Sequence, residues 1–289
     1  MDVPVLIQSV SRRIALFEAF RDGLDLHRLA KGVSIGWGFW DCGKGKRVFP
    51  FRFETPLLNH QGFRHNGDCS GYFRISIGNP ARPDLCKFGK EGANRLEEMK
   101  IRPPSKSISY IPGRGHIVYV LQTPGDKSLA GRNQLLRASD DIQHIRALTN
   151  VPLYVVDHPD RRCGISRIQG KYGGTEGLYS RLRASCKKAG AKLVAGPSCQ
   201  YLHGCGAVVT YSSGTGVEFI LKGVPVIALL PSSYLWGAVP DNLQVLASQW
   251  KIESSVISRR LSRIAFCEWT MDEATSGKAQ DSFSHIIYS

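Results

Sequence analysis

The sequence lacks the residue spacings that bind metal ions. It contains eight cysteines, but no two of them form a CxxC pair and none has Cys/His zinc spacing. No DxD motif is present either. We therefore expect no metal cofactor, and we interpret the cysteines as reduced thiols of a cytoplasmic protein.

Long hydrophobic runs are also missing. No apolar stretch approaches the ~18 residues that a transmembrane helix needs. The first twenty residues have no basic segment before their apolar stretch and no small-residue cleavage site. We therefore expect them to be folded protein and not a signal peptide.

Acidic residues are few relative to basic ones. The chain of 289 residues has 24 Asp and Glu against 38 Lys and Arg, a formal net charge of +14. Such a surplus favours a polyanionic partner: nucleic acid, an anionic membrane surface or phosphorylated substrates. Each local cluster of basic residues is also compatible with a solubilising surface.

The two halves of the chain differ in hydrophobic pattern. In residues 1–110, short apolar pieces at 33–35, 48–53 and 72–77 lie among many Gly, Asn and Asp residues, which predicts short strands and long loops. Adjacent prolines at 103 and 104 oppose helix and central strand and mark a linker. We expect two domains, residues 1–112 and residues 113–289, the second with a helical tail.

After this linker, apolar strands alternate with helices. Apolar runs lie at 116–122, 151–156, 192–195, 207–211 and 224–230, and helical patterns at 134–148, 178–189 and 215–222. This alternation predicts an α/β domain with a parallel, Rossmann-like sheet and right-handed crossovers.

Ligands of such a sheet bind beyond the carboxyl ends of its strands, where three loops carry polar residues. In the first, Gly125 permits a tight turn and Gln122 and Asp126 could reach a bound group, although an ordinary polar turn has the same composition. In the second, His158, followed by Pro159, could donate to a phosphate or carry a proton.

The third loop carries the strongest signal. It brings Ser212 and Ser213 to the start of a predicted helix at Thr215, where free N–H groups and the helix dipole favour phosphate. Gly214 lets the backbone approach a ligand closely, and Glu218 can accept hydrogen bonds from ribose hydroxyls. A plain Ser-capped helix with Glu218 in a capping box is the alternative interpretation.

These motifs together resemble the donor half of GT-B glycosyltransferases. His158-Pro159, Ser212-Ser213, the helix with Glu218 and the following Gly-x-Pro-Val-Ile are most similar to bacterial capsule Kdo transferases and to sialyltransferases with HP and SS motifs. The resemblance implies an α/β, GT-B-like fold with two Rossmann-like domains that face a central cleft, the acceptor-side domain first. It also implies a nucleotide-sugar donor, CMP- or UDP-linked.

Other stretches extend the resemblance. Residues 35–38 and 53–58 are similar to the GWG and E-D-G-F stretches of the capsule transferases, with Thr55-Pro56 in place of an acidic residue and glycine. Residues 122–126 and an end pattern over 260–277 resemble phage-borne proteins. If a phage encodes the chain, its expected location is the cytoplasm of the bacterial host.

A metal-independent transferase needs fixed donors for the negative charge that develops on the leaving phosphate. We expect Ser212, Ser213 and His158 to supply them. The acceptor hydroxyl also needs a base within hydrogen-bonding distance. Our candidates, in order, are Glu54, Asp68 and Asp126; for Glu54, a carboxylate paired with a neighbouring arginine is an equally good interpretation.

The positive charge and the phage-like layout favour DNA as the acceptor, with the sugar transferred to a modified base that is reached in the groove or flipped out. Three alternatives stay open. The acceptor could be a surface or lipid-linked saccharide next to an anionic membrane. The protein could bind nucleic acid without catalysis on a GT-B-like fold, or it could be a nucleotide-sugar epimerase.

Overall fold

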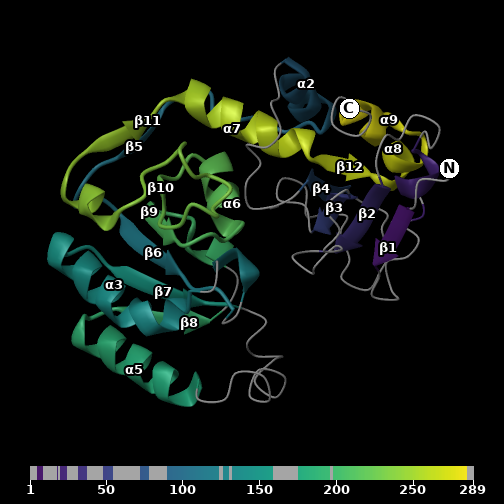
Figure 1. The fold of residues 1–289 in the computed structure, drawn as a ribbon. Helices are drawn as coiled ribbons and strands as arrows, with labels where there is room; N and C mark the ends of the chain where they lie inside the picture. Colours follow the sequence, from purple (N-terminus) through teal and green to yellow (C-terminus); the bar gives the residue numbers. More distant parts are fainter. Residues whose placement is uncertain are drawn as a thin grey trace. The chain divides into compact units, whose positions relative to one another are not determined.

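The chain folds into two compact units (Figure 1). The computed structural model describes residues 5–8, 18, 20–24, 32–37, 48–54, 72–77, 90–123, 126–129, 132–158, 175–195 and 198–284. Unit 1 comprises Met1–Ile101 together with Leu261–Ser289, and unit 2 comprises Arg102–Arg260. These limits differ from the expected 1–112 and 113–289, because the last part of the chain packs with the first.

Unit 2 is built on a five-stranded, fully parallel sheet in the order β10-β9-β6-β7-β8. The strands are β6 (His116–Val120), β7 (Leu153–Asp157), β8 (Lys192–Ala195), β9 (Cys205–Thr210) and β10 (Val226–Ala228). The chain runs from the central β6 outward to β8 and then returns to the other side of β6 for β9 and β10. This is the doubly wound order of a Rossmann-like fold, so the α/β prediction for this part of the chain is confirmed.

Helices cover the sheet of unit 2 because their apolar residues fall on one side. The helices are α3 (Gln134–Leu148), α5 (Thr175–Lys188) and α6 (Thr215–Leu221), with 3-10 turns η4 (Lys127–Leu129), η5 (Ser198–Tyr201) and η6 (Leu243–Ala247). Ile142 and Ile145 of α3 and Leu182 of α5 are buried in one core with Ile117 and Leu153 of the sheet. The Asn133 side chain caps α3 by accepting the Leu135 N–H at 3.1 Å.

A small antiparallel pair completes unit 2, formed by β5 (Ile108–Tyr110) and β11 (Trp250–Ile252). The rings of Tyr110 and Trp250 stack with centroids 5.5 Å apart. The Tyr110 hydroxyl donates to the Leu246 carbonyl at 3.1 Å. These contacts fasten the ends of the unit to its core.

Unit 1 contains a mixed sheet in the order β1-β2-β3-β4-β12. The strands are β1 (Val5–Gln8), β2 (Gly32–Trp37), β3 (Val48–Glu54), β4 (Tyr72–Ile77) and β12 (Glu268–Thr270). The first three are parallel, whereas β4 and β12 are antiparallel to their neighbours. The described strands of unit 1 therefore depart from the all-parallel sheet expected of a second Rossmann-like domain.

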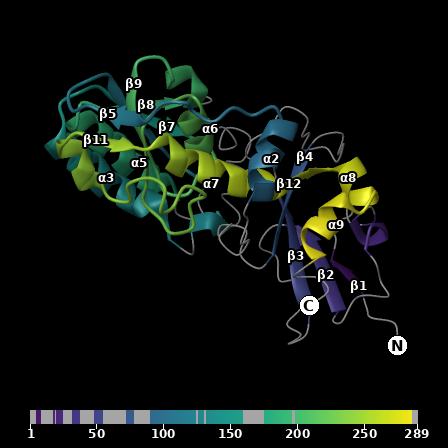
Figure 2. The same cartoon turned by 90° about the horizontal axis from the view of Figure 1, so that it is seen from above.

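The helices described in unit 1 come from both ends of the sequence (Figure 2). They are α2 (Lys90–Glu98), α8 (Met271–Thr275) and α9 (Lys278–Ser282), and α7 (Ser254–Phe266) spans the boundary between the units. Phe266 and Trp269 pack edge to face with Phe283, which is fully buried. The C-terminal helices thus contribute to the core of the unit that the N-terminal strands begin.

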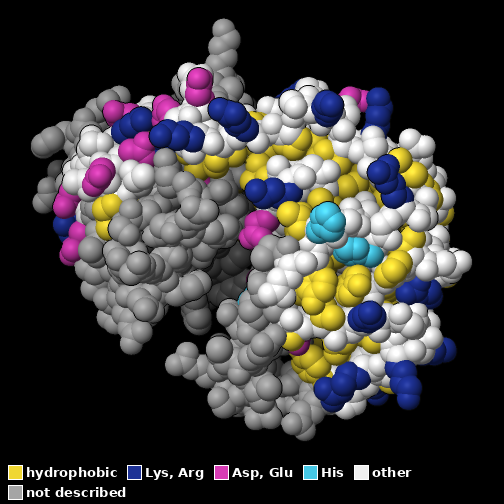
Figure 3. Space-filling model, turned by 180° about the vertical axis from the view of Figure 1, so that it is seen from behind, with side chains coloured by type: hydrophobic (Ala, Val, Ile, Leu, Met, Phe, Trp, Pro, Cys, Tyr) yellow, Lys and Arg dark blue, Asp and Glu magenta, His cyan; other side chains and the backbone are white. Residues whose placement is uncertain are grey.

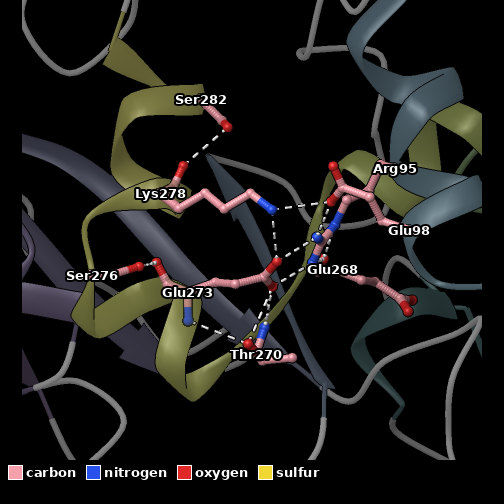
Figure 4. A network of polar contacts seen from close by, with 8 residues as sticks. All are labelled: Arg95, Glu98, Glu268, Thr270, Glu273, Ser276, Lys278 and Ser282. Carbon is pink, nitrogen blue, oxygen red and sulfur yellow. Dashed lines mark hydrogen bonds and ion pairs between the residues drawn. The ribbon is translucent and has the colours of Figure 1, made fainter.

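Arg95 on α2 joins these distant segments (Figure 4). It is only 4% exposed, and its guanidinium lies 4.4 Å from the centre of the Trp269 ring. Its Nη1 donates to Glu98 at 2.8 Å and to Glu273 at 2.6 Å. Its Nη2 donates to Glu273 at 2.5 Å and to the Glu268 carbonyl at 2.7 Å. One buried cation therefore holds β12 and α8 against α2.

We expect Glu273→Gln to reduce the free energy of unfolding at neutral pH by about 2 kcal/mol. Burial alone raises the pKa of Glu273, but hydrogen bonds from Arg95 and from the Thr270 N–H outweigh it and lower the pKa to about 2. A carboxyl group with a lowered folded pKa stabilises the fold above its unfolded pKa and loses this effect as the pH falls through its folded pKa. The difference between variant and wild type should therefore shrink between about pH 4.5 and pH 2.

Urea denaturation of the wild type and the variant over this pH range measures the effect. Glu98→Gln is the control, because Glu98 also binds Arg95 but its side chain is 46% exposed, where solvent screens the pair. Equal losses in the two variants would show that Glu273 has no special part in the network.

Candidate functional site

The loops after β6 and β9 leave the sheet at its topological switch point. The chain proceeds from β6 to β7 on one side and reaches β9 on the other, so these two loops diverge from neighbouring strands. Ligands of doubly wound sheets bind at this position. The structure therefore brings together Gln122, which follows β6, and Ser212, which follows β9, two residues that the sequence had singled out separately.

A buried polar network connects these two loops. The Gln122 Oε1 accepts the Ser212 N–H at 2.8 Å, and its Nε2 donates to the Oγ atoms of Ser212 at 3.1 Å and of Ser128 at 3.0 Å. The two serine hydroxyls lie 2.9 Å apart. The Gln122 N–H donates to Gln134 Oε1 at 2.7 Å, and the Ser128 carbonyl accepts from the Ser232 hydroxyl. Gln122, Ser128 and Ser212 are at most 9% exposed, so their side chains hold loops together.

Asp126 belongs to the same group of residues. Its Oδ1 accepts the Ser128 N–H at 2.9 Å, and its Oδ2 accepts from Gln122 Nε2 at 3.3 Å. Asp126, the third candidate base, lies in unit 2 with the predicted donor loops, whereas Glu54 and Asp68 belong to unit 1. The hydrogen bonds of Asp126 give it a part in shaping the turn before η4. Gly125 lies outside the described residues.

Ser213, Gly214, Thr215 and Glu218 lie at the start of α6 and are partly exposed. Ser213 Oγ accepts the Thr215 N–H at 3.2 Å, and the Ser213 N–H donates to Thr210 Oγ1 at 3.1 Å. The Ser213 hydroxyl thus accepts one N–H of the first turn, but the N-cap of α6 is Gly214, which has no side-chain hydrogen bond, so the alternative interpretation of a serine-capped helix is met only in part. These partly exposed residues follow the carboxyl end of β9, at the edge of the sheet where ligands of this fold bind.

A glycine one residue further into α6 has a packing role. A Cβ atom at Gly216 would lie 3.3 Å from Thr210 Cγ2 and 3.4 Å from Leu235 Cδ1. The close approach that this glycine permits is therefore between α6 and its own sheet. Gly214 has helical backbone angles (φ −57°, ψ −24°), which other residues also adopt.

His158 lies directly after β7 and is partly exposed. Its N–H donates to Asp157 Oδ1 at 2.8 Å, and the Tyr179 hydroxyl lies 3.0 Å from Oδ1 and 2.9 Å from Oδ2 of the same carboxylate. The Asp157 carboxylate thus connects the end of β7 to α5. Nothing in the sequence pointed to Tyr179 beyond its place on a predicted helix. Pro159 lies outside the described residues.

Of the candidate bases in unit 1, the structure describes only the backbone of Glu54. Glu54 is the last residue of β3 and is paired in register with Arg74 of β4, which is also paired with Glu268 of β12. Arg74 and Glu268 are both buried. Arg74 thus occupies the register position opposite Glu54, and both interpretations of Glu54 stay predictions. The Glu54 side chain and the whole of Asp68 lie outside the described part of the chain.

Cysteines and potential metal ligands add no further reactive group to the described residues. Burial raises the pKa of the Cys186 thiol to about 11 and that of Cys205 to about 12, which keeps both protonated and unreactive. In the described ranges, no group of three or more His, Cys, Asp and Glu side chains is placed to hold a metal ion. None of the described helices combines the length and the apolar character needed to cross a bilayer.

Comparison with solved structures identifies the fold. The chain is similar to a structure described as KpsC, beta Kdo 2,7 transferase, from Thermosulfurimonas dismutans, with a TM-score of 0.54 and 13% identity. The match covers 97% of this chain and 99% of that one. The two share a fold. The predicted similarity to Kdo transferases is confirmed at the level of the fold, whereas two Rossmann-like domains that face a cleft stay a prediction.

A second structure, the beta Kdo 2,4 transferase of KpsC from the same organism, is 16% identical with a TM-score of 0.48, over 86% of each chain. No protein-family model matches the sequence, and no curated protein matches it.

We expect Gln122→Leu to reduce the free energy of unfolding by about 2 kcal/mol. The substitution keeps an approximate side-chain volume but leaves the buried Ser212 N–H without its acceptor. Chemical denaturation measures the loss. The matched control is Gln244→Leu. Gln244 is exposed, and the hydrogen bond described for its amide is to His144, which is also exposed. A loss no larger than that of the control would contradict the role given to Gln122.

Proposed function

We propose that this protein is a glycosyltransferase that moves a sugar from a nucleotide-sugar donor to a hydroxyl group of a saccharide. The observation that carries the proposal is the fold shared with a Kdo 2,7 transferase over nearly the whole of both chains. The polar loops that meet at the switch point of unit 2 support it, because this fold binds nucleotides there.

The donor would bind at the carboxyl edge of the unit 2 sheet. Ser213, Gly214 and Thr215 would face the phosphate, and His158 would donate a further hydrogen bond to it. Glu218 would accept hydrogen bonds from ribose hydroxyls. Gln122 and Ser212 would not touch the donor, because both are buried; they would hold the loops that carry these residues. Fixed donors would then stabilise the charge that develops on the leaving phosphate.

The base would come from unit 1, and Glu54 is our first candidate. A cleft between two facing domains stays a prediction. Arg74, opposite Glu54 in the sheet, would keep a carboxyl group at that position ionised, which suits a group that must accept a proton from an acceptor hydroxyl. By the resemblance to Kdo transferases, the donor would be CMP-linked, with a UDP-linked sugar as the alternative.

A saccharide acceptor now has better support than DNA. The DNA prediction rested on the net charge of +14 and on the phage-like layout. Figure 3 shows Lys and Arg side chains spread over the face that it draws and not gathered into one stripe. The structurally similar protein is a transferase of Kdo, a sugar, by its description. DNA remains an outcome of the binding experiment below.

We expect CMP to raise the melting temperature of the protein by a few degrees at millimolar concentration, through mass action on the folded state. A thermal-shift panel of CMP, UDP, GDP and ADP, with and without duplex DNA, measures the effect. Ser213→Ala and Glu218→Ala should lose most of the shift. Glu253→Ala should keep it, because Glu253 is an exposed glutamate of unit 2 whose described partners are Ser107 and Lys251.

A different result would reject the proposal. If no nucleotide stabilises the wild type and DNA alone does so, in a manner that fades with salt, the protein is a nucleic-acid-binding protein.

We expect Glu54→Gln to lower kcat for sugar transfer by about 100-fold or more, since general-base catalysis contributes on this scale. The amide keeps the shape of the side chain but accepts no proton. Donor binding, measured in the same thermal-shift experiment, should be unchanged. A variant that retains wild-type kcat would remove Glu54 from the mechanism and leave Asp68 as the next candidate. Release of CMP from CMP-Kdo in the presence of a saccharide acceptor provides the assay.

A further inference from the structure

A partly buried carboxylate binds the residue at the start of the turn after β9. Asp141 of α3 accepts two hydrogen bonds at its Oδ2, from the Tyr119 hydroxyl at 2.6 Å and from the Tyr211 hydroxyl at 2.8 Å. Tyr119 is fully buried and Tyr211 is 3% exposed. Burial and the nearby Asp141 raise the pKa of both phenols, which therefore remain protonated donors. A helix, the central strand β6 and the segment that follows β9 thus meet at one oxygen atom.

The two tyrosines differ in how their backbones are held. Tyr119 is inside β6, where it is paired with Val155 on one side and Val209 on the other. Tyr211 follows the last residue of β9 and lies outside the strand. Its carbonyl accepts the Leu230 N–H at 3.1 Å, and its side chain reaches Asp141. The side-chain hydrogen bond therefore matters more for the position of the Tyr211 backbone than for that of Tyr119.

Tyr211 leads directly into the residues assigned to the donor site. The next residue, Ser212, has its N–H fixed by Gln122. Ser213 follows, the first residue after β9 whose side chain is partly exposed. Residues 211 and 212 are thus held from three elements: α3, the loop after β6 and the segment after β10. The direction in which Ser213 and the first turn of α6 face depends on these inward-facing contacts.

We propose that Asp141 and Tyr211 are positioning residues for the donor site, and that their hydrogen bond fixes the turn at residues 211–213 so that Ser213 meets the donor phosphate. The inference rests on the proposed function. Its physical basis is preorganisation: a turn that is already held in the binding geometry loses less conformational freedom when the ligand arrives. Neither residue touches the donor, and each acts through the residues that follow Tyr211.

Tyr211→Phe tests the proposal, with Tyr119→Phe as its matched control. Each variant removes one hydroxyl from the same Asp141 oxygen, and both tyrosines are buried, so similar losses of stability are expected. Tyr211→Phe should raise the Kd for CMP about tenfold, the scale of one hydrogen bond to a charged group. Tyr119→Phe should change it by less than about twofold.

A second measurement follows the turn itself, without any nucleotide. The amide hydrogens of residues 212–216 should exchange about tenfold faster in Tyr211→Phe than in the wild type, and at the wild-type rate in Tyr119→Phe. Asp141→Asn provides another variant in case Tyr211→Phe does not fold. It keeps an acceptor oxygen but removes the charge, and it should raise the Kd and the exchange rate in the same direction.

The outcomes separate this inference from the proposed function. Equal changes in the two tyrosine variants would overturn it, because the cluster would then only clamp α3 to the sheet. If the wild type binds no nucleotide, the proposed function fails. The exchange comparison then still decides whether Tyr211 holds the turn: an unchanged exchange rate overturns that statement, and a faster one supports it.

Discussion

A buried amide that joins two parallel strands must find all its hydrogen bonds inside the protein, and this requirement shapes unit 2. Gln122 follows the central strand, and its side chain accepts from one loop while it donates to another. Leaving any of these groups unpaired would cost on the order of 1–3 kcal/mol, so the loops after β6 and β9 have one favoured arrangement. The proposed donor site, which would stabilise developing charge, depends on this arrangement of the two loops.

The residues that hold these two loops in place differ from those that are exposed on them. Ser212 is buried and completes the network, whereas its neighbour Ser213 is partly exposed at the first turn of α6. Tyr211 is buried like Ser212, and its hydrogen bond to the partly buried Asp141 links the start of the turn to α3. The two serines of the SS motif thus differ: the Ser212 side chain is buried in the network, and the Ser213 side chain is partly exposed.

Unit 1 depends on contacts between residues far apart in the sequence. Arg95 and Glu273 are separated by 178 positions, yet their ion pair fixes α8 against α2. The antiparallel pairing of β12 with β4 places the C-terminal segment in the same sheet as the N-terminal strands. Register also sets Arg74 between Glu54 and Glu268. These long-range contacts explain why the last part of the chain belongs to unit 1.

The sequence by itself determined the alternation of strands and helices in unit 2, because the local order of apolar and polar residues decides which residues of each element can be buried. The predicted helix at 134–148 and the predicted strand at 192–195 match α3 and β8 at both ends. The resemblance of the HP and SS motifs to those of Kdo transferases also predicted the fold that this chain shares with one of them. Only the tertiary structure decided which polar residues lie inside, that Tyr119 and Tyr211 share Asp141, and that β12 joins the sheet of unit 1. Those outcomes depend on which groups meet across the fold, and a buried polar group finds its partner by spatial proximity, which local pattern does not encode.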